Sequence, residues 1–186
     1  MSDFEFIFAL FGLVLGLALA EILAGLRRAI EMRLRPGSSA RVGWLTPMLG
    51  LFVILDLLSF WHAAWASRGL LTVTGRSLMA VTAFAGAYYL AASLVFPRGA
   101  DENRDFDEHF FRVRKIIIGM LLALLICQLA WYSSVPQLAP LLLRPLSLVL
   151  TVILVVLMIA AMVTPDRWAR IAMAALVARY VIVYLL

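Results

Sequence analysis

The chain has 186 residues, of which 65% are hydrophobic and 15% charged, and its mean hydropathy is +1.01. A soluble domain carries roughly 25% charged residues, so this composition excludes a soluble globular protein and indicates a chain that lies in lipid. The net charge of +5 is not accompanied by a basic groove with interleaved aromatic residues, so we expect membrane lipids rather than nucleic acid as its partner.

The predicted elements are six membrane-spanning helices, each close to the roughly 20 residues that a spanning helix needs. In chain order, the apolar stretches are residues 6–26, 45–66, 78–96, 116–134, 146–163 and 168–186. The short segments between them leave no room for a soluble catalytic domain, and a chain in lipid must satisfy its backbone within helices. The sequence therefore predicts an all-α polytopic membrane protein, a bundle of six transmembrane helices forming a single domain over residues 1–186.

Small residues mark one face of the first span, where Gly12, Gly16 and Ala20 recur every four residues. This spacing lets another helix approach closely, either within the chain or in a second copy. Packing within the chain is the commoner use of such a ridge. The ridge also leads us to expect a homo-oligomer.

The one strongly hydrophilic stretch covers residues 101–115 and precedes the fourth span. Asp105 followed by Glu108 resembles a helix-capping arrangement, with basic residues further on. Apolar side chains then share one helical face, namely Phe106, Phe110 and Val113. The pattern predicts an amphipathic extension that leads into the fourth span.

Catalytic and cofactor motifs are missing from the sequence: it has no GxSxG, CxxC, HExxH or glycine-rich phosphate loop. Asp101, Asp105 and His109 share a helical face, but no second histidine or cysteine cluster accompanies them. We therefore prefer a solvated charged face to a metal site there. His62 is interpreted as a residue of the membrane interface. We predict no enzymatic activity, no cofactor and no metal.

The distribution of basic residues predicts the orientation. The first, third and fifth loops carry twelve of the Lys and Arg residues, whereas the second and fourth carry three. Because short cytoplasmic loops are rich in Lys and Arg, we expect the first set inside and both termini outside the cytoplasm. This arrangement predicts a multi-pass membrane protein with its basic loops in the cytoplasm.

Polar residues within the spans are the candidate site. Asp56 and Arg179 are each twelfth in their spans and Gln128 is thirteenth, so all three lie near the middle of the membrane, and Tyr88 and Tyr89 reach a similar depth. A lone carboxylate there costs about 3 kcal/mol on insertion scales. We therefore predict a direct ion pair between Asp56 and Arg179, completed by Gln128 and a tyrosine hydroxyl.

Two further polar residues are secondary candidates. Glu21 lies near the inner end of the first span, where it can reach Arg28 or the cytoplasmic loops, and His62 follows Asp56 on the second span. The midplane cluster has two interpretations. It either fixes which helices adjoin, or it forms part of an ion or proton path.

Two functions follow from this cluster. The first is a small homo-oligomeric channel or transporter for an ion or a proton. The second is a non-catalytic membrane subunit that scaffolds or regulates a larger complex of other membrane subunits. The sequence does not select the substrate.

Four segments carry a resemblance: "FGLVLGLALAEILAGL", "VGWLTPMLGLFVILDLLSFW", "YYLAASLVFP" and the acidic "DFDEHF". Together they resemble a group of small bacterial multi-pass inner-membrane proteins of unknown function. The resemblance implies an inner-membrane location. It implies no activity and no catalytic or binding residue.

Overall fold

The structure is a computed structural model that describes residues 3–34, 43–70, 72–97 and 105–185. Seven helices form within these ranges and no strand does. They are α1 (Asp3–Leu34), α2 (Leu45–Ala66), α3 (Gly75–Leu94), α4 (Phe106–Ser134), α5 (Ala139–Leu142), α6 (Pro145–Val163) and α7 (Asp166–Leu185). All except α5 are long and apolar enough to cross a membrane. The predictions of an all-α fold and of six spans are confirmed, and the chain is a multi-pass membrane protein.

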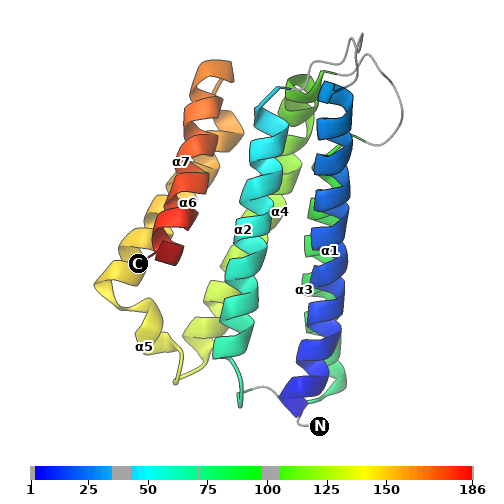
Figure 1. The fold of residues 1–186 in the computed structure, drawn as a ribbon. Helices are drawn as coiled ribbons and strands as arrows, with labels where there is room; N and C mark the ends of the chain where they lie inside the picture. Colours follow the sequence, from blue (N-terminus) through cyan, green and yellow to red (C-terminus); the bar gives the residue numbers. More distant parts are fainter. Residues whose placement is uncertain (1–2, 35–42, 71, 98–104, 186) are drawn as a thin grey trace.

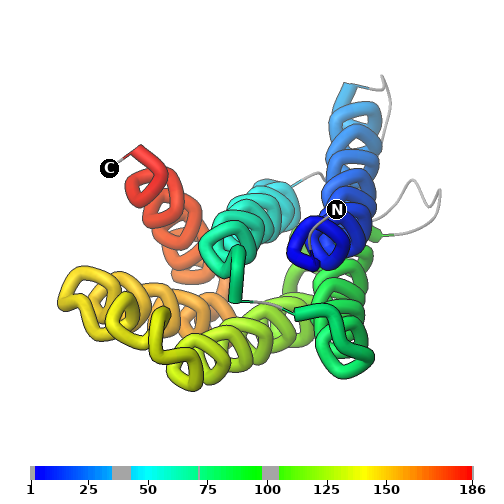
Figure 2. The backbone as a smooth tube through the Cα atoms, turned by 90° about the horizontal axis from the view of Figure 1, so that it is seen from below, coloured from blue at the N-terminus to red at the C-terminus, as the bar shows by residue number. Residues whose placement is uncertain are grey.

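The six long helices form two layers of three, seen end-on in Figure 2. One layer holds α7, α2 and α1, and the other holds α6, α4 and α3. Each helix of one layer contacts its counterpart in the other: α1 packs on α3, α2 on α4 and α7 on α6. Helices α2 and α4 are therefore central, and a polar side chain on α2 can be covered from several directions.

The helices α1 and α4 extend beyond the predicted spans (Figure 1). The amphipathic extension of the fourth span is confirmed, because α4 begins at Phe106 rather than near residue 116. The Asp105 carboxylate caps it by accepting hydrogen bonds from the backbone N–H groups of Asp107 (2.8 Å) and Glu108 (3.3 Å). Helix α3 starts three residues before the predicted span, because Thr74 and Ser77 form a capping box. The short helix α5 was not predicted.

Residues at the start of α4 form hydrogen bonds with residues at the start of α2. The Asp107 carboxylate accepts a hydrogen bond from the backbone N–H of Leu45 (3.1 Å), and the Thr46 hydroxyl donates to the carbonyl of Phe106 (2.5 Å). Helix α2 has no cap from its own preceding residue. A side chain from α4 therefore satisfies one of the unpaired N–H groups at the start of α2.

Arg114 of α4 binds the C-terminal end of another helix, α6. It is buried, with 8% of its surface exposed, and its Nη1 donates to the carbonyls of Ala161 (3.1 Å) and Thr164 (2.6 Å) at the end of α6. Its guanidinium also lies 4.6 Å from the centre of the Phe111 ring. A cation at the carbonyl end of a helix is favourable, so Arg114 fixes where the α6–α7 hairpin turns.

The small residues of α1 have different surroundings. A Cβ added at Gly12 would lie 2.9 Å from the Trp61 ring of α2, and one added at Gly25 would overlap the ring of Phe96. Gly16, in contrast, is exposed, and a Cβ added there would have no side chain and no part of another helix within 4 Å. The predicted ridge is therefore used for packing within the chain at Gly12 but not at Gly16.

Candidate functional site

The centre of the candidate site is Asp56, the side chain of which is only 5% exposed. It lies in the middle of α2, a helix of 22 residues with no other charged residue. Buried apolar residues precede and follow it along the same face, among them Val53, Leu57 and Phe60. The hydrophobic sequence thus places the carboxylate inside the bundle rather than against lipid.

Two tyrosines surround the carboxylate. The Tyr88 hydroxyl of α3 donates a hydrogen bond to Asp56 Oδ2, and the Tyr180 hydroxyl of α7 donates to Asp56 Oδ1. Both tyrosines are buried, with 0% and 2% of their surfaces exposed. Hydrogen bonds that donate to a carboxylate are about twice as strong as neutral ones. Two of them, one on each oxygen, offset the cost of placing Asp56 in the membrane.

Aromatic packing fixes the positions of these hydroxyl groups. The Tyr88 ring meets the Phe60 ring edge to face at 5.4 Å, and the Tyr180 ring lies 6.0 Å from the Phe52 ring. Phe52 and Phe60 are on the same helix as Asp56, one turn before and one turn after it. The two tyrosine rings therefore dock against α2 on either side of the carboxylate.

The predicted direct ion pair between Asp56 and Arg179 is wrong for the described structure. The Arg179 Nη2 donates to the carbonyl of Leu150 on α6 at 3.1 Å, and its guanidinium stacks 4.7 Å from the centre of the Tyr180 ring. Successive helical residues point about 100° apart, so Tyr180 turns toward α2 while Arg179 turns toward α6. The two charged groups therefore contact different parts of Tyr180, the guanidinium its ring face and the carboxylate its hydroxyl.

The other predicted members of the cluster lie outside it. Gln128 and Tyr89 are half-buried, and in the described part of the chain neither forms a hydrogen bond with Asp56. Tyr89 follows Tyr88 and so points away from the direction that leads to Asp56. Glu21 is half-buried on α1. Of the predicted residues, the structure brings Asp56 and Tyr88 into contact and leaves Gln128 and Tyr89 out.

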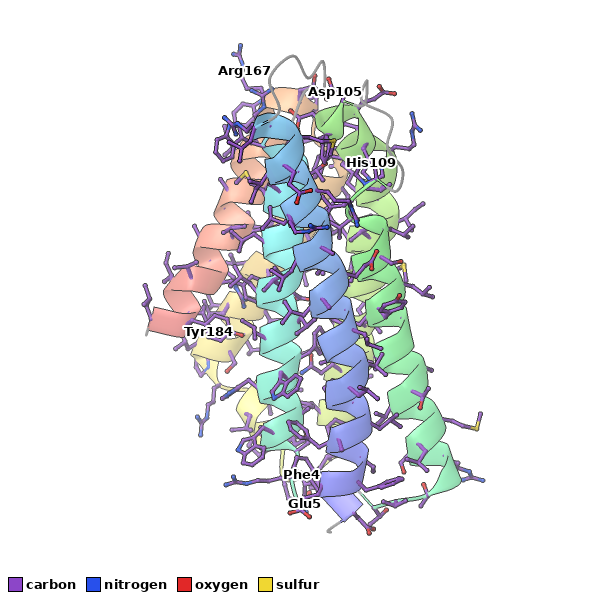
Figure 3. All side chains as sticks on the ribbon, turned by 45° about the vertical axis from the view of Figure 1, so that its right-hand side comes forward. Phe4, Glu5, Asp105, His109, Arg167 and Tyr184 are labelled. Atoms are coloured by element: carbon purple, nitrogen blue, oxygen red, sulfur yellow. The ribbon has the colours of Figure 1, made fainter. Side chains whose placement is uncertain are left out.

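His62 is exposed and lines an open hollow of about 500 Å³ on the surface of the bundle. Three helices form this hollow through the residues Phe8, Leu58, Trp61, His62, Trp65 and Tyr184. Figure 3 shows Tyr184 on α7, away from the end that carries Asp105 and His109. The Tyr184 hydroxyl lies 3.5 Å from the carbonyl of Leu55, the residue before Asp56. The hollow therefore lies beside the part of α2 that carries Asp56, but Asp56 is not among the residues that line it.

Tyr180 is the residue that sequence analysis missed. Its depth in the last span matches that of Asp56, and this was the available signal. The prediction chose its neighbour Arg179 instead, because the charge of Arg179 is opposite to that of Asp56. Only the rotation of α7 about its own axis decides which of the two side chains faces α2.

No three His, Cys, Asp or Glu side chains among the described residues gather closely enough to hold a metal ion. Comparison of the chain with protein-family models, with curated proteins and with solved structures finds no match. The function must therefore be argued from the geometry around Asp56.

Proposed function

We propose that the protein is a channel or transporter that binds and passes a proton at Asp56 in the interior of the membrane. The observation that carries this proposal is the position of the carboxylate, buried in mid-span between the hydroxyls of Tyr88 and Tyr180. A carboxyl group can hold or release a proton, and tyrosine hydroxyls both donate and accept hydrogen bonds. Carboxylates at this depth commonly belong to ion or proton pathways.

Two polar residues that line the surface hollow support the proposal. His62 opens to the hollow and lies six residues after Asp56 on α2, which corresponds to about 9 Å along the helix axis. Tyr184 lines the same hollow and lies one turn beyond Tyr180 on α7. His62 and Tyr184 are therefore the residues that we propose to carry a proton between the hollow and Asp56.

Proton flux into liposomes tests this function. Purified protein is reconstituted with a pH-sensitive dye inside, and an imposed pH gradient drives proton entry while potassium chloride and valinomycin on both sides prevent a membrane potential. We expect Asp56→Asn to lose most of the flux, because the amide keeps the shape but holds no exchangeable acid proton. The matched control is Glu31→Gln, which removes an exposed carboxylate paired with Arg27 and is expected to retain the flux. Equal flux in Asp56→Asn and the parent contradicts the proposal.

We also propose that the arginine-rich end of the bundle faces the cytoplasm of a cell with an inner membrane, in keeping with the resemblance to small bacterial membrane proteins. The end of α1 and the starts of α4 and α7 lie at this end (Figure 1). The Lys and Arg residues described there are Arg27, Arg28, Arg33, Arg112, Arg114, Lys115, Arg167 and Arg170. Cytoplasmic ends of membrane proteins are enriched in Lys and Arg. Both termini then face outward.

Cysteine labelling in intact cells tests the orientation. In a Cys127→Ser background, Glu108→Cys and Arg76→Cys place single exposed cysteines at opposite ends of the bundle. A membrane-impermeant reagent is expected to label position 76 from outside and position 108 only after the cells are opened. The reverse pattern contradicts the orientation.

A second candidate function is a non-catalytic subunit of a larger membrane complex, and one observation favours it. Gly16 presents an open, exposed small-residue position on α1 that no other part of the described chain covers. Such positions permit close approach of a helix from another chain, either a second copy or a different subunit. Mass measurement in nanodiscs separates a monomer, a homo-oligomer and a complex with a stoichiometric partner.

A further inference from the structure

Arg179 has unused hydrogen-bonding capacity. It is half-buried on α7, its Nε is fully covered without a hydrogen-bond partner, and Nη2 donates only to the Leu150 carbonyl. Nη1 has no partner in the described part of the chain and is not among the fully buried atoms. A guanidinium within a membrane span normally pairs with a charge or several carbonyls. Arg179 therefore has a donor group available to a ligand.

The charge of Arg179 interacts with the Asp56 carboxylate, and Tyr180 contacts both residues. The Tyr180 ring lies against the guanidinium, and its hydroxyl donates to the Asp56 carboxylate. The other group that faces the carboxylate is the Tyr88 hydroxyl of α3. While Asp56 is ionised, the site formed by Asp56, Tyr180 and Arg179 is neutral overall. When Asp56 takes up a proton, the site carries a net positive charge inside the membrane, which is costly.

We propose that Arg179 binds a small monovalent anion, and that this anion binds more tightly when Asp56 is protonated. The inference rests on the proposed function and names its co-substrate class: the proton and the anion enter the site together, which keeps it neutral. We choose a small anion because the Nε edge of the guanidinium is covered by protein and Nη2 is bonded to Leu150, which leaves only the Nη1 end as a donor. Linkage makes the effect reciprocal, since a bound anion strengthens proton binding by the same factor.

Anion binding is measured on the purified full chain in detergent, without any flux. Chloride is the probe, and gluconate at equal ionic strength is the reference. Chloride is expected to raise the melting temperature more at pH 5 than at pH 8, because a ligand of the folded state stabilises it. The apparent chloride affinity is expected to be about tenfold tighter at the lower pH, within the usual range of coupling between two sites.

Three variants identify the groups involved. Arg179→Gln is expected to lose the chloride effect at both pH values, whereas Arg170→Gln, which removes an exposed arginine from the same helix, is expected to retain it. Asp56→Asn mimics the protonated acid, so its chloride affinity is expected to be high and independent of pH. This last variant keeps the test decisive if Arg179→Gln does not fold.

Several results would overturn the inference. They are a chloride effect that survives in Arg179→Gln, a chloride effect in Asp56→Asn that still varies with pH, and no chloride effect in the parent protein. A change in the mass of the assembly in Arg179→Gln without any chloride effect assigns Arg179 to an acidic partner helix instead. A different result contradicts the proposed function, namely proton flux that does not depend on Asp56. Proton flux that depends on Asp56 but not on chloride preserves the function and refutes the anion site.

Discussion

Removal of the Tyr180 hydroxyl is the most direct test of the site geometry. The substitution Tyr180→Phe keeps the ring that packs near Phe52 and removes only the donor to Asp56 Oδ1. A hydrogen bond to a charged group contributes about 1.5–3 kcal/mol to stability. Because the carboxylate is 5% exposed, water does not readily replace the lost donor. We therefore expect a loss near the upper part of that range.

The assay is reversible unfolding of the protein in mixed micelles, and the measured quantity is the free energy of unfolding. Tyr184→Phe is the matched control, because it removes a hydroxyl from the same helix one turn later, where the residue is 46% exposed. Its hydroxyl lies 3.5 Å from the Leu55 carbonyl, which is beyond a good hydrogen bond, and its other polar neighbour is the neutral Ser59 side chain. The control is expected to destabilise the protein by less than Tyr180→Phe, because a neutral hydrogen bond contributes only about 0.5–1.5 kcal/mol.

Double-mutant cycles then separate the observed geometry from the simpler pairing of opposite charges. The cycle of Asp56→Ala with Tyr180→Phe is expected to show a coupling of about 1.5–3 kcal/mol, because the groups are in contact. The cycle of Asp56→Ala with Arg179→Gln is expected to show a smaller coupling, since Arg179 donates its hydrogen bond to the Leu150 carbonyl and not to Asp56. A larger coupling with Arg179 than with Tyr180, or a neutral Tyr180→Phe, would refute the arrangement described here.

Three further predictions concern helix ends and helix packing away from the Asp56 site. Arg114→Met should destabilise the protein by about 1.5–3 kcal/mol, because the end of α6 loses its charged donor, and hydrogen exchange of the α6–α7 turn should increase. Gly25→Ala should cost about 1–3 kcal/mol through overlap with the Phe96 ring. Gly16→Ala, where space is open, should be neutral or stabilise by up to about 1 kcal/mol, and equal effects at the two glycines would contradict the packing. Asp107→Ala should cost about 1 kcal/mol by removing the acceptor at the start of α2, measured as a lower unfolding free energy.

Hydrophobicity and local capping made much of the fold predictable. Six apolar segments of spanning length require helices, because lipid offers no hydrogen bonds to an unpaired backbone. The start of α4 was also predictable, since Asp105 and the apolar face after it act within a few residues of each other. The contacts of Asp107 with Leu45 and of Arg114 with Ala161 were not, because they join residues more than 40 positions apart.

The sequence by itself determined that Asp56 lies deep in a membrane helix and needs partners, since depth follows from counting residues along an apolar span. The tertiary structure decided that those partners are the hydroxyls of Tyr88 and Tyr180. Charge and depth pointed equally well to Arg179. What separates the two choices is the rotation of α7 about its axis, which places Tyr180 toward α2 and Arg179 toward α6. That rotation is set by the packing of all six helices together, and no local pattern in the sequence encodes it.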